Sequence, residues 1–210
     1  MKKKVGIFLA LLMTILLCPT TSNAAVWYYA SGNYVSSAPI KPSTGLKFYV
    51  DYSAITIYGS GSFTVGFDWN GNYKGNVAAI AQYPASASAF PGYFPISADS
   101  TMPLHVRGET FYYNSSGTLI GGTFPMDSTS IYKCSIRLNS NPTVFNDSTG
   151  TFSLMYLEKV IRHEIGHVLL LKHPSTLYFP SVMHQGEPKN YISATITTDD
   201  RNNIIAKWGN

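Results

Sequence analysis

Residues 163–173 read HEIGHVLLLKH, a stretch whose three histidines and one glutamate have spacings that suit a metal site. On a helix, residues four apart lie one turn above each other, so His163 and His167 share a face. Glu164 lies beside them, where its carboxylate can take a proton from a metal-bound water. His173 follows beyond the expected helix and can return as a third ligand. Three protein ligands leave one zinc position open, which is typical of catalytic zinc.

The residues around this motif predict the helix that carries it. Apolar residues recur at intervals of three and four over 154–169, the period of an amphipathic helix, and Ser153 or Thr151 is expected to cap its start. A second helix is expected near the end of the chain. There residues 197–200 supply cap hydroxyls and first-turn acids, and Gly209 supplies a stop.

The chain before the motif has the alternating pattern of β-strands, separated by turn residues. A short helix capped by Ser62 is expected at 62–69, and a long surface loop rich in Pro, Ala and Ser at 82–102. Strands that precede helices in this way predict the α+β class. The expected strands are residues 46–52, 77–81, 104–113, 118–124 and 131–138.

Residues 1–24 have the composition of a secretory signal peptide. Three lysines precede the apolar run Val5–Cys18, and small residues follow up to Ala24, so we expect cleavage there and secretion of the remainder. A retained membrane anchor is an alternative, but a span needs roughly 20 apolar residues and Pro19 ends this run too soon. A lipid anchor on Cys18 is a weaker alternative, because bulky Leu17 stands where a small residue is expected.

Composition limits the partners and the organisation of the mature chain. Removing the leader, with its three lysines and no acidic residue, lowers the formal net charge from +4 to +1. That balance indicates no nucleic-acid partner and no stable membrane association. We expect an irregular lead-in at 25–44, one domain at 45–210 and a monomer. Only Cys134 remains after processing, which excludes an internal disulfide, and a buried strand thiol is expected.

The motif resembles that of the metzincin zinc peptidases, and within them the matrixin-like enzymes. Their HExxHxxGxxH pattern is followed at residues 163–173 except for one glycine, and Met183 matches their Met-turn methionine. Further likeness, in LKFYVDY, LIGGTFP, SIRLN and TTDDRNNIIAKWG, extends over residues 45–210. The resemblance implies a twisted, mostly parallel sheet of about five strands with an antiparallel edge strand, an active-site helix and a C-terminal helix. It also implies one zinc ion on His163, His167 and His173, with Met183 beneath it.

Several positions depart from the family pattern. Leu170 replaces the glycine, whose expected left-handed conformation costs another residue roughly 1–2 kcal/mol, and this strain puts the position of His173 in question. Gln185 stands where astacins and serralysins have a tyrosine, so no tyrosine ligand is expected. Residues 25–44 contain no propeptide cysteine, and a lone His105 is expected to be an ordinary strand residue. Nothing in the sequence supports a calcium site.

These features predict a secreted zinc-dependent endopeptidase in which Glu164 is the general base for attack by a zinc-bound water. Its partner would be a protein or peptide substrate. The chain of that substrate is expected to add as a strand along the segment formed by Leu119, Ile120, Gly121 and Gly122. A pocket walled by residues 184–191 is expected to admit one substrate side chain.

Three other interpretations remain open from the sequence. The motif could be a chance match whose histidines are only packed or solvated. The chain could be a zinc-binding interaction protein on the same scaffold, with weak catalysis because Leu170 misplaces His173. An enzyme of the thermolysin type would need a later glutamate ligand, and only Glu187 is present.

Overall fold

The computed structural model describes residues 28–30, 33–34, 38, 42, 45–72, 77–82, 93–122, 130–175, 179–186 and 193–209. The predicted signal peptide at 1–24 and Glu187 lie outside these ranges. No helix in the described ranges is long and apolar enough to cross a membrane. The strands are β1 Asn33–Tyr34, β2 Leu46–Val50, β3 Val77–Gln82, β4 Phe94–Asp99, β5 Gly108–Tyr113, β6 Leu119–Gly122, β7 Ser130–Ile131 and β8 Lys133–Asn139. The helices are α2 Tyr52–Tyr58, α3 Leu154–Val168 and α4 Thr198–Trp208, with 3-10 helices η2 Ser60–Trp69 and η4 Pro142–Phe145.

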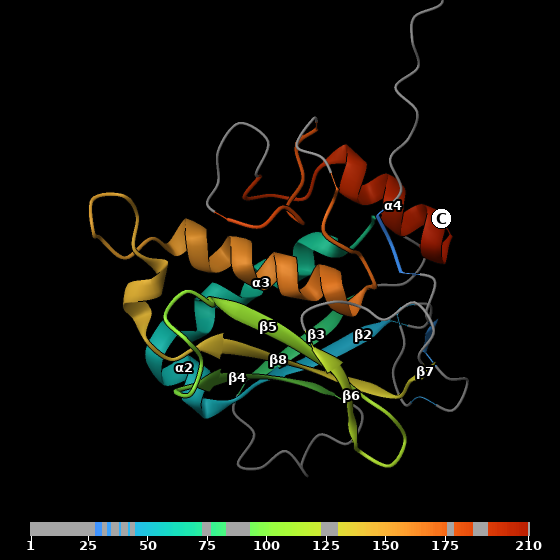
Figure 1. The fold of residues 1–210 in the computed structure, drawn as a ribbon, viewed down its shortest axis with the longest axis horizontal. Coiled ribbons are helices and arrows are strands. Elements are labelled where there is room, and N and C mark those ends of the chain that lie inside the picture. The colour runs from blue at the N-terminus through green and yellow to red at the C-terminus, as the bar shows by residue number, and fades with distance from the viewer. Residues whose placement is uncertain are drawn as a thin grey trace, which may run out of the picture.

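A mixed sheet forms one layer of the fold, and helix α3 crosses one of its faces (Figure 1). Within the described ranges its strand order is β3-β2-β4-β8-β5-β6. The first four of these strands are parallel, β5 runs antiparallel to β8, and β6 runs antiparallel to β5. The predicted α+β class and the mostly parallel sheet are therefore confirmed. The edge strand β6 does pair antiparallel with its neighbour, but the strand that opposes the parallel group is β5.

The prediction of a continuous loop over residues 82–102 is wrong, because part of this segment forms β4 in the middle of the sheet. Phe94 and Ile96 are buried on its core side, at 1% and 0% exposure. Pro95 lies between them, paired in register with Tyr49. Proline has no backbone N–H to donate in a central strand, so the prolines of this segment favoured a loop in the sequence analysis. Burial of the two flanking apolar side chains outweighs that loss.

The chain turns into helix immediately after β2, so the strand expected at 46–52 ends at Val50. Asp51 caps α2 through a hydrogen bond from the Ser53 backbone N–H to its side chain, at 2.9 Å. The helix expected at 62–69 is the 3-10 helix η2, and it begins at Ser60 after Gly59. The hydroxyl of Ser62 donates to the Tyr58 carbonyl instead of capping a helix.

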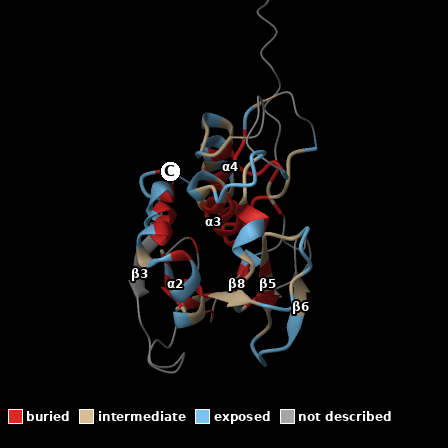
Figure 2. Cartoon of the chain, turned by 90° about the vertical axis from the view of Figure 1, so that its left-hand side faces the viewer, coloured by how far each residue is buried: buried red, intermediate tan, exposed pale blue. Residues whose placement is uncertain are grey.

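Helix α3 is largely buried between the sheet and α4 (Figure 2). Its apolar residues Leu157, Ile161, Ile165 and Val168 have no exposed surface, which confirms the period predicted from the sequence. The helix packs against η2 and β5. Ser153 stands at its N-cap position, but no side-chain cap hydrogen bond forms there.

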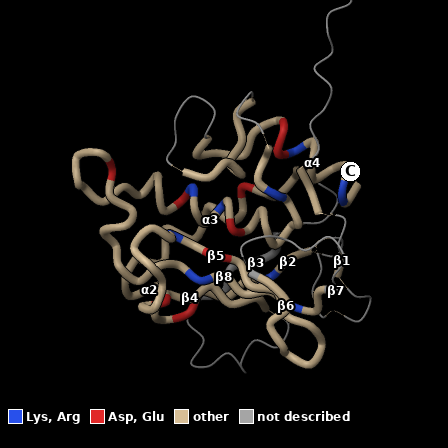
Figure 3. The backbone as a smooth tube through the Cα atoms, in the orientation of Figure 1, with Lys and Arg blue, Asp and Glu red and all other residues tan. Residues whose placement is uncertain are grey.

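Helix α4 begins at the cap predicted for it. The Thr197 side chain accepts from the Asp200 backbone N–H, and the Asp200 side chain accepts from the Thr197 N–H, which is a capping box. Gly209 ends the helix with a φ of 85°. Charged residues are few in the fold, and several of both signs lie along α3 (Figure 3).

Residues from the predicted lead-in at 25–44 belong to the same core. Tyr28, Ala30, Tyr34 and Ala38 are all buried there. Cys134 is fully buried in β8, as expected for a strand thiol, and its Sγ lies 3.0 Å from the Tyr34 hydroxyl.

Candidate metal centre

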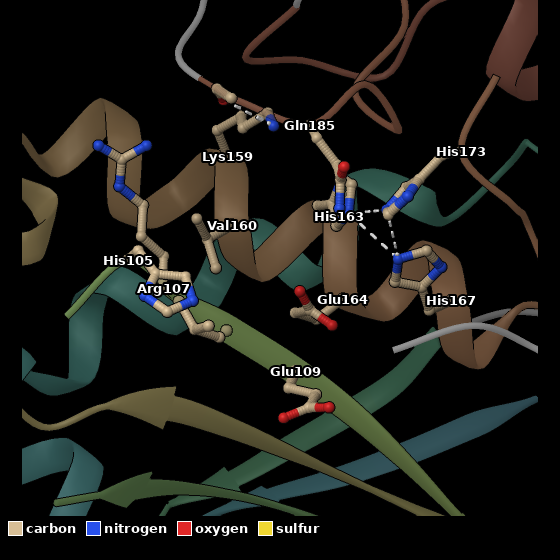
Figure 4. A pocket seen from close by; sticks show the side chains of 13 residues that line it. His105, Arg107, Glu109, Lys159, Val160, His163, Glu164, His167, His173 and Gln185 are labelled. Atoms are coloured by element: carbon tan, nitrogen blue, oxygen red, sulfur yellow. Dashed lines mark hydrogen bonds between the residues drawn. The ribbon is translucent and has the colours of Figure 1, made fainter. Parts of the chain in front are cut away.

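Three imidazoles converge at the C-terminal part of α3 (Figure 4). The Nε2 atom of His163 lies 3.1 Å from that of His167 and 2.9 Å from that of His173. The third side of the triangle, between His167 and His173, is also 3.1 Å. These three residues are the histidine cluster that could hold a metal ion among the described residues. The structure thus brings together the three ligands predicted from the sequence.

The other ring nitrogens show that this cluster suits a cation. The Nδ1–H of His163 donates to the Val182 carbonyl at 2.9 Å, and that of His167 to the Leu171 carbonyl at 2.8 Å. A neutral imidazole with its proton on Nδ1 presents a lone pair at Nε2. Lone pairs of two such rings face each other here, and a metal ion relieves that repulsion. Tetrahedral zinc, with Zn–N of about 2.0–2.1 Å, requires nitrogens roughly 3.3 Å apart, close to the observed spacing.

Burial keeps these rings neutral. It lowers the pKa of His163 well below its usual range, and the positive charge that protonated neighbours would carry lowers it further. Burial likewise lowers the pKa of His167 to about 3 and that of His173 to about 4. All three rings are therefore in the form that binds metal at neutral pH.

The turn that carries the third histidine contains the left-handed residue expected from the sequence. Leu170 has a φ of 67°, the only positive value among the described non-glycine residues. Leu170 N–H donates to the His167 carbonyl and Leu171 N–H to the Gly166 carbonyl. These two bonds make a Schellman motif, in which the left-handed residue is usually glycine. His173 nevertheless reaches the other histidines, so the strain at Leu170 does not displace it.

Side chains from three other elements satisfy the last carbonyls of α3. The Tyr112 hydroxyl donates to the His167 carbonyl and the Tyr34 hydroxyl to the Val168 carbonyl, both at 2.9 Å. The Trp208 Nε1–H donates to the Leu169 carbonyl at 2.8 Å. A helix end without such donors leaves buried carbonyls unpaired. These contacts fix the point at which the chain leaves the helix toward His173.

Glu164 lines the same cavity as the three histidines, one residue along α3 from His163. Its side chain is 5% exposed, and its Oε2 accepts a hydrogen bond of 2.8 Å from the Thr110 hydroxyl. Burial raises the pKa of Glu164 to about 7, against the lowering effects of the Thr110 hydrogen bond and the Lys159 charge. A carboxyl with a pKa near 7 can both accept and release a proton at neutral pH.

Met183, the predicted Met-turn residue, packs against Gly166 of α3. A Cβ atom added at Gly166 would lie 2.3 Å from the Met183 Sδ, so only a glycine leaves room for the thioether. The Met183 N–H donates to the Ser181 hydroxyl oxygen, and the Ser181 hydroxyl donates to Asp200. Asp200 also accepts from the Val182 N–H at 3.0 Å. Helix α4 thereby holds Val182, whose carbonyl orients His163.

A cavity of about 410 Å³ is lined by the three histidines and Glu164. Gln185 and Gly186 form one wall, in agreement with part of the pocket expected at 184–191. The remainder of that pocket, residues 187–191, is outside the described ranges. Leu119, Ile120, Gly121 and Gly122 form β6, and none of them lines the cavity.

Residues of β5 and of the loop before it also line the cavity, and the sequence analysis did not predict this. The expectation that His105 is a strand residue is wrong. It lies exposed in the loop before β5 and lines the cavity. Arg107 and Glu109 line it as well, and so does Lys159 of α3. A signal for Lys159 was present, since it precedes His163 by four residues and therefore shares its helix face.

A scan against protein-family models and a search of curated proteins each found no match for this chain.

Proposed function

We propose that this protein is a secreted zinc-dependent endopeptidase of the metzincin type, similar to the matrixins. The observation that supports this most is the triangle of Nε2 atoms, 2.9–3.1 Å apart, in one cavity with the carboxyl of Glu164. A tri-histidine site with an open position and an adjacent carboxyl is the arrangement used for metal-assisted hydrolysis.

His163, His167 and His173 would hold the zinc ion through Nε2. When bound, zinc supplies a Lewis acid that lowers the pKa of water and polarises a carbonyl. The protein's own part centres on Glu164, which takes a proton from the attacking water. The same carboxyl then delivers that proton to the amine that leaves, and so returns to its ionised form. Thr110 holds Oε2 of Glu164 in place during both transfers.

The start of β5 lines the cavity, which supports a substrate chain lying beside this strand. Gly108, which lines the cavity, has no side chain to block its wall. A Cβ at this position would lie 2.7 Å from a methyl group of Val160 and 3.1 Å from Cγ of Glu164. A peptide strand along β6, through Leu119–Gly122, remains part of the proposal.

The proposal is tested by replacing Glu164 with alanine and measuring zinc content together with casein cleavage. We expect zinc to be retained and cleavage to fall by at least about a hundredfold, the scale of losing general acid–base catalysis. Glu158→Ala is the matched control, because Glu158 lies on the same helix, pairs with Arg162 and does not line the cavity. Unchanged cleavage by Glu164→Ala contradicts the proposed mechanism.

The alternative of a catalytically weak binding protein depended on a displaced His173. The Nε2 of His173 lies 2.9 Å from that of His163, and the Nε2 atoms of His163 and His167 are 3.1 Å apart. His173 is therefore not displaced in this structure, and the reason for expecting weak catalysis does not apply. Either kind of protein would bind one zinc ion, but only an endopeptidase would cleave peptides, and a chelator would stop that cleavage.

A further inference from the structure

Lys159 is a buried cation in the wall of the cavity. Its side chain reaches the loop beyond Met183, and the residue is 4% exposed. The Nζ atom donates to the His184 carbonyl at 2.6 Å and to the Gly186 carbonyl at 3.1 Å. An ammonium group carries three N–H donors. The third is not donated to any atom among the described residues, and no carboxylate there is within ion-pair distance of Nζ.

A second cation, Arg107, also lines the cavity. Arg107 donates through Nε to the Val144 carbonyl at 2.6 Å, with its guanidinium carbon 5.5 Å from the centre of the Tyr156 ring. In Figure 4, Lys159 lies above Val160 with its side chain directed toward Gln185, and Arg107 lies on the opposite side of Val160 from the three histidines. Glu109 lies apart from Lys159 in this view, below Glu164. Lys159 and Arg107 therefore line the same cavity as Glu164 and Glu109.

The buried charge of Lys159 is costly unless something pairs with it. Burial lowers the pKa of Lys159 to about 8, so the ammonium is still charged at neutral pH. Two carbonyl dipoles partly replace its lost hydration, but a buried ion usually has a partner of opposite charge. Lys159 is one helical turn from His163, a separation of about 5–6 Å between Cβ atoms. A substrate residue adjoining the scissile bond can reach across that distance.

We propose that Lys159 binds a substrate carboxylate in this cavity, and that the protein selects peptides with an acidic side chain next to the scissile bond. Lys159 is the specificity-determining residue, and Arg107 strengthens the positive potential around it. This inference depends on the proposed endopeptidase function. The same chemistry could bind the terminal carboxylate of a peptide, and the experiment separates the two sources.

The test uses the zinc-loaded protein and pairs of peptides with both ends blocked, identical except for Glu or Gln at one position near the cleaved bond. We expect kcat/KM to favour the Glu peptide by on the order of tenfold to a hundredfold, the value of a charged hydrogen bond. In Lys159→Met that ratio falls to about one. The control Lys133→Met removes an exposed lysine over the Tyr113 ring, and should keep the wild-type ratio.

Equal rates for the two peptides in the wild type overturn the inference, and this result needs no variant to fold. A Glu preference that survives in folded, zinc-bound Lys159→Met overturns the role of Lys159. Peptides with free C-termini are compared with their amides in parallel. If only the free carboxylate raises kcat/KM, the site reads a chain terminus and the proposed side-chain selectivity is wrong.

Absence of cleavage for every peptide would contradict the proposed function without deciding this inference. In that case fluorescence anisotropy of labelled Glu and Gln peptides with the wild-type protein decides it. Binding of the Glu peptide that is on the order of tenfold tighter, and lost in Lys159→Met, upholds the carboxylate site. Equal binding of the two peptides overturns it.

Discussion

The first two histidines of the candidate metal centre and the third are held by different kinds of structure. His163 and His167 lie on one helix, whose repeat sets their spacing. His173 lies beyond a turn that needs one residue in the left-handed conformation and several outside contacts. Among these, the Ala30 N–H donates to the Leu170 carbonyl at 2.8 Å, and the Lys172 N–H donates to the Tyr28 carbonyl at 2.5 Å.

This difference separates what is local from what is shared across the fold. The helical pair requires only α3 and the two carbonyls that accept its Nδ1 protons. The third ligand depends on a segment far away in the chain, near Tyr28, and on buried phenol and indole donors. Perturbing the helix should therefore affect two ligands directly, whereas perturbing the turn should act through stability and through His173.

The largest effect is expected from removing a ligand. His167→Ala and His173→Ala should each lower zinc affinity by more than about a hundredfold, the upper end of what loss of outer contacts costs. Competition with a chelator of known affinity measures this. His105→Ala is the control, because His105 lines the cavity but is not part of the histidine triangle. The zinc affinity of this variant should match that of the wild type. Retention of wild-type affinity in His173→Ala would break the comparison by making the third ligand dispensable.

Gly166→Ala should give the next largest change, on the helix side of the comparison. Its new Cβ would lie 2.3 Å from the Met183 Sδ, and such over-packing costs about 3 kcal/mol of unfolding free energy. Urea denaturation measures the loss. Gly61→Ala is a matched control, because a Cβ there meets nothing within 4 Å and its φ is not positive. Equal stability of the two variants would show that Met183 does not pack as described.

Leu170→Gly tests the turn. Losing a fully buried leucine costs 2–5 kcal/mol, whereas relief of the left-handed strain returns roughly 1–2 kcal/mol. We expect a net loss of about 2 kcal/mol in urea denaturation, with zinc still bound. A more stable variant would show that strain at Leu170 exceeds the value of its burial.

The smallest effect is expected from Tyr34→Phe, which removes one donor to the end of α3. The Val168 carbonyl loses the hydroxyl at 2.9 Å, for a cost of about 1 kcal/mol. Tyr52→Phe is the control, since Tyr52 is 66% exposed and should leave the unfolding free energy unchanged. If Tyr34→Phe is also without effect, the outside contacts of the turn matter less than the comparison requires.

The sequence predicted the parts of the site that follow from the helical period and from the form of a helix C-terminus. Helical spacing found His163 and His167, and the resemblance to a known pattern supplied His173 and Met183. The left-handed position at Leu170 was also expected, because a helix C-terminus has a recognisable form. The helical pair and the turn at Leu170 depend on neighbours within a few residues along the chain, whereas His173 and Met183 came from the resemblance alone.

The parts that were missed depend on contacts between distant segments. Strand β4 contains a proline that argues against a strand, and only its pairing with β2 and β8 reveals its place. Helical spacing places Lys159 on the face of His163, but its burial follows only from the loop at His184 and Gly186, whose carbonyls accept from Nζ. Tertiary burial of this kind overrides local pattern, and a single sequence does not show it.

Zinc stoichiometry tests the central claim most directly. The purified mature protein, measured by elemental mass spectrometry after dialysis, should contain one zinc ion per chain. Glu164→Ala should contain the same amount, and the double variant His163→Ala/His167→Ala should contain none. A wild-type protein free of metal after exposure to zinc, or a double variant that retains a full equivalent, would contradict the account.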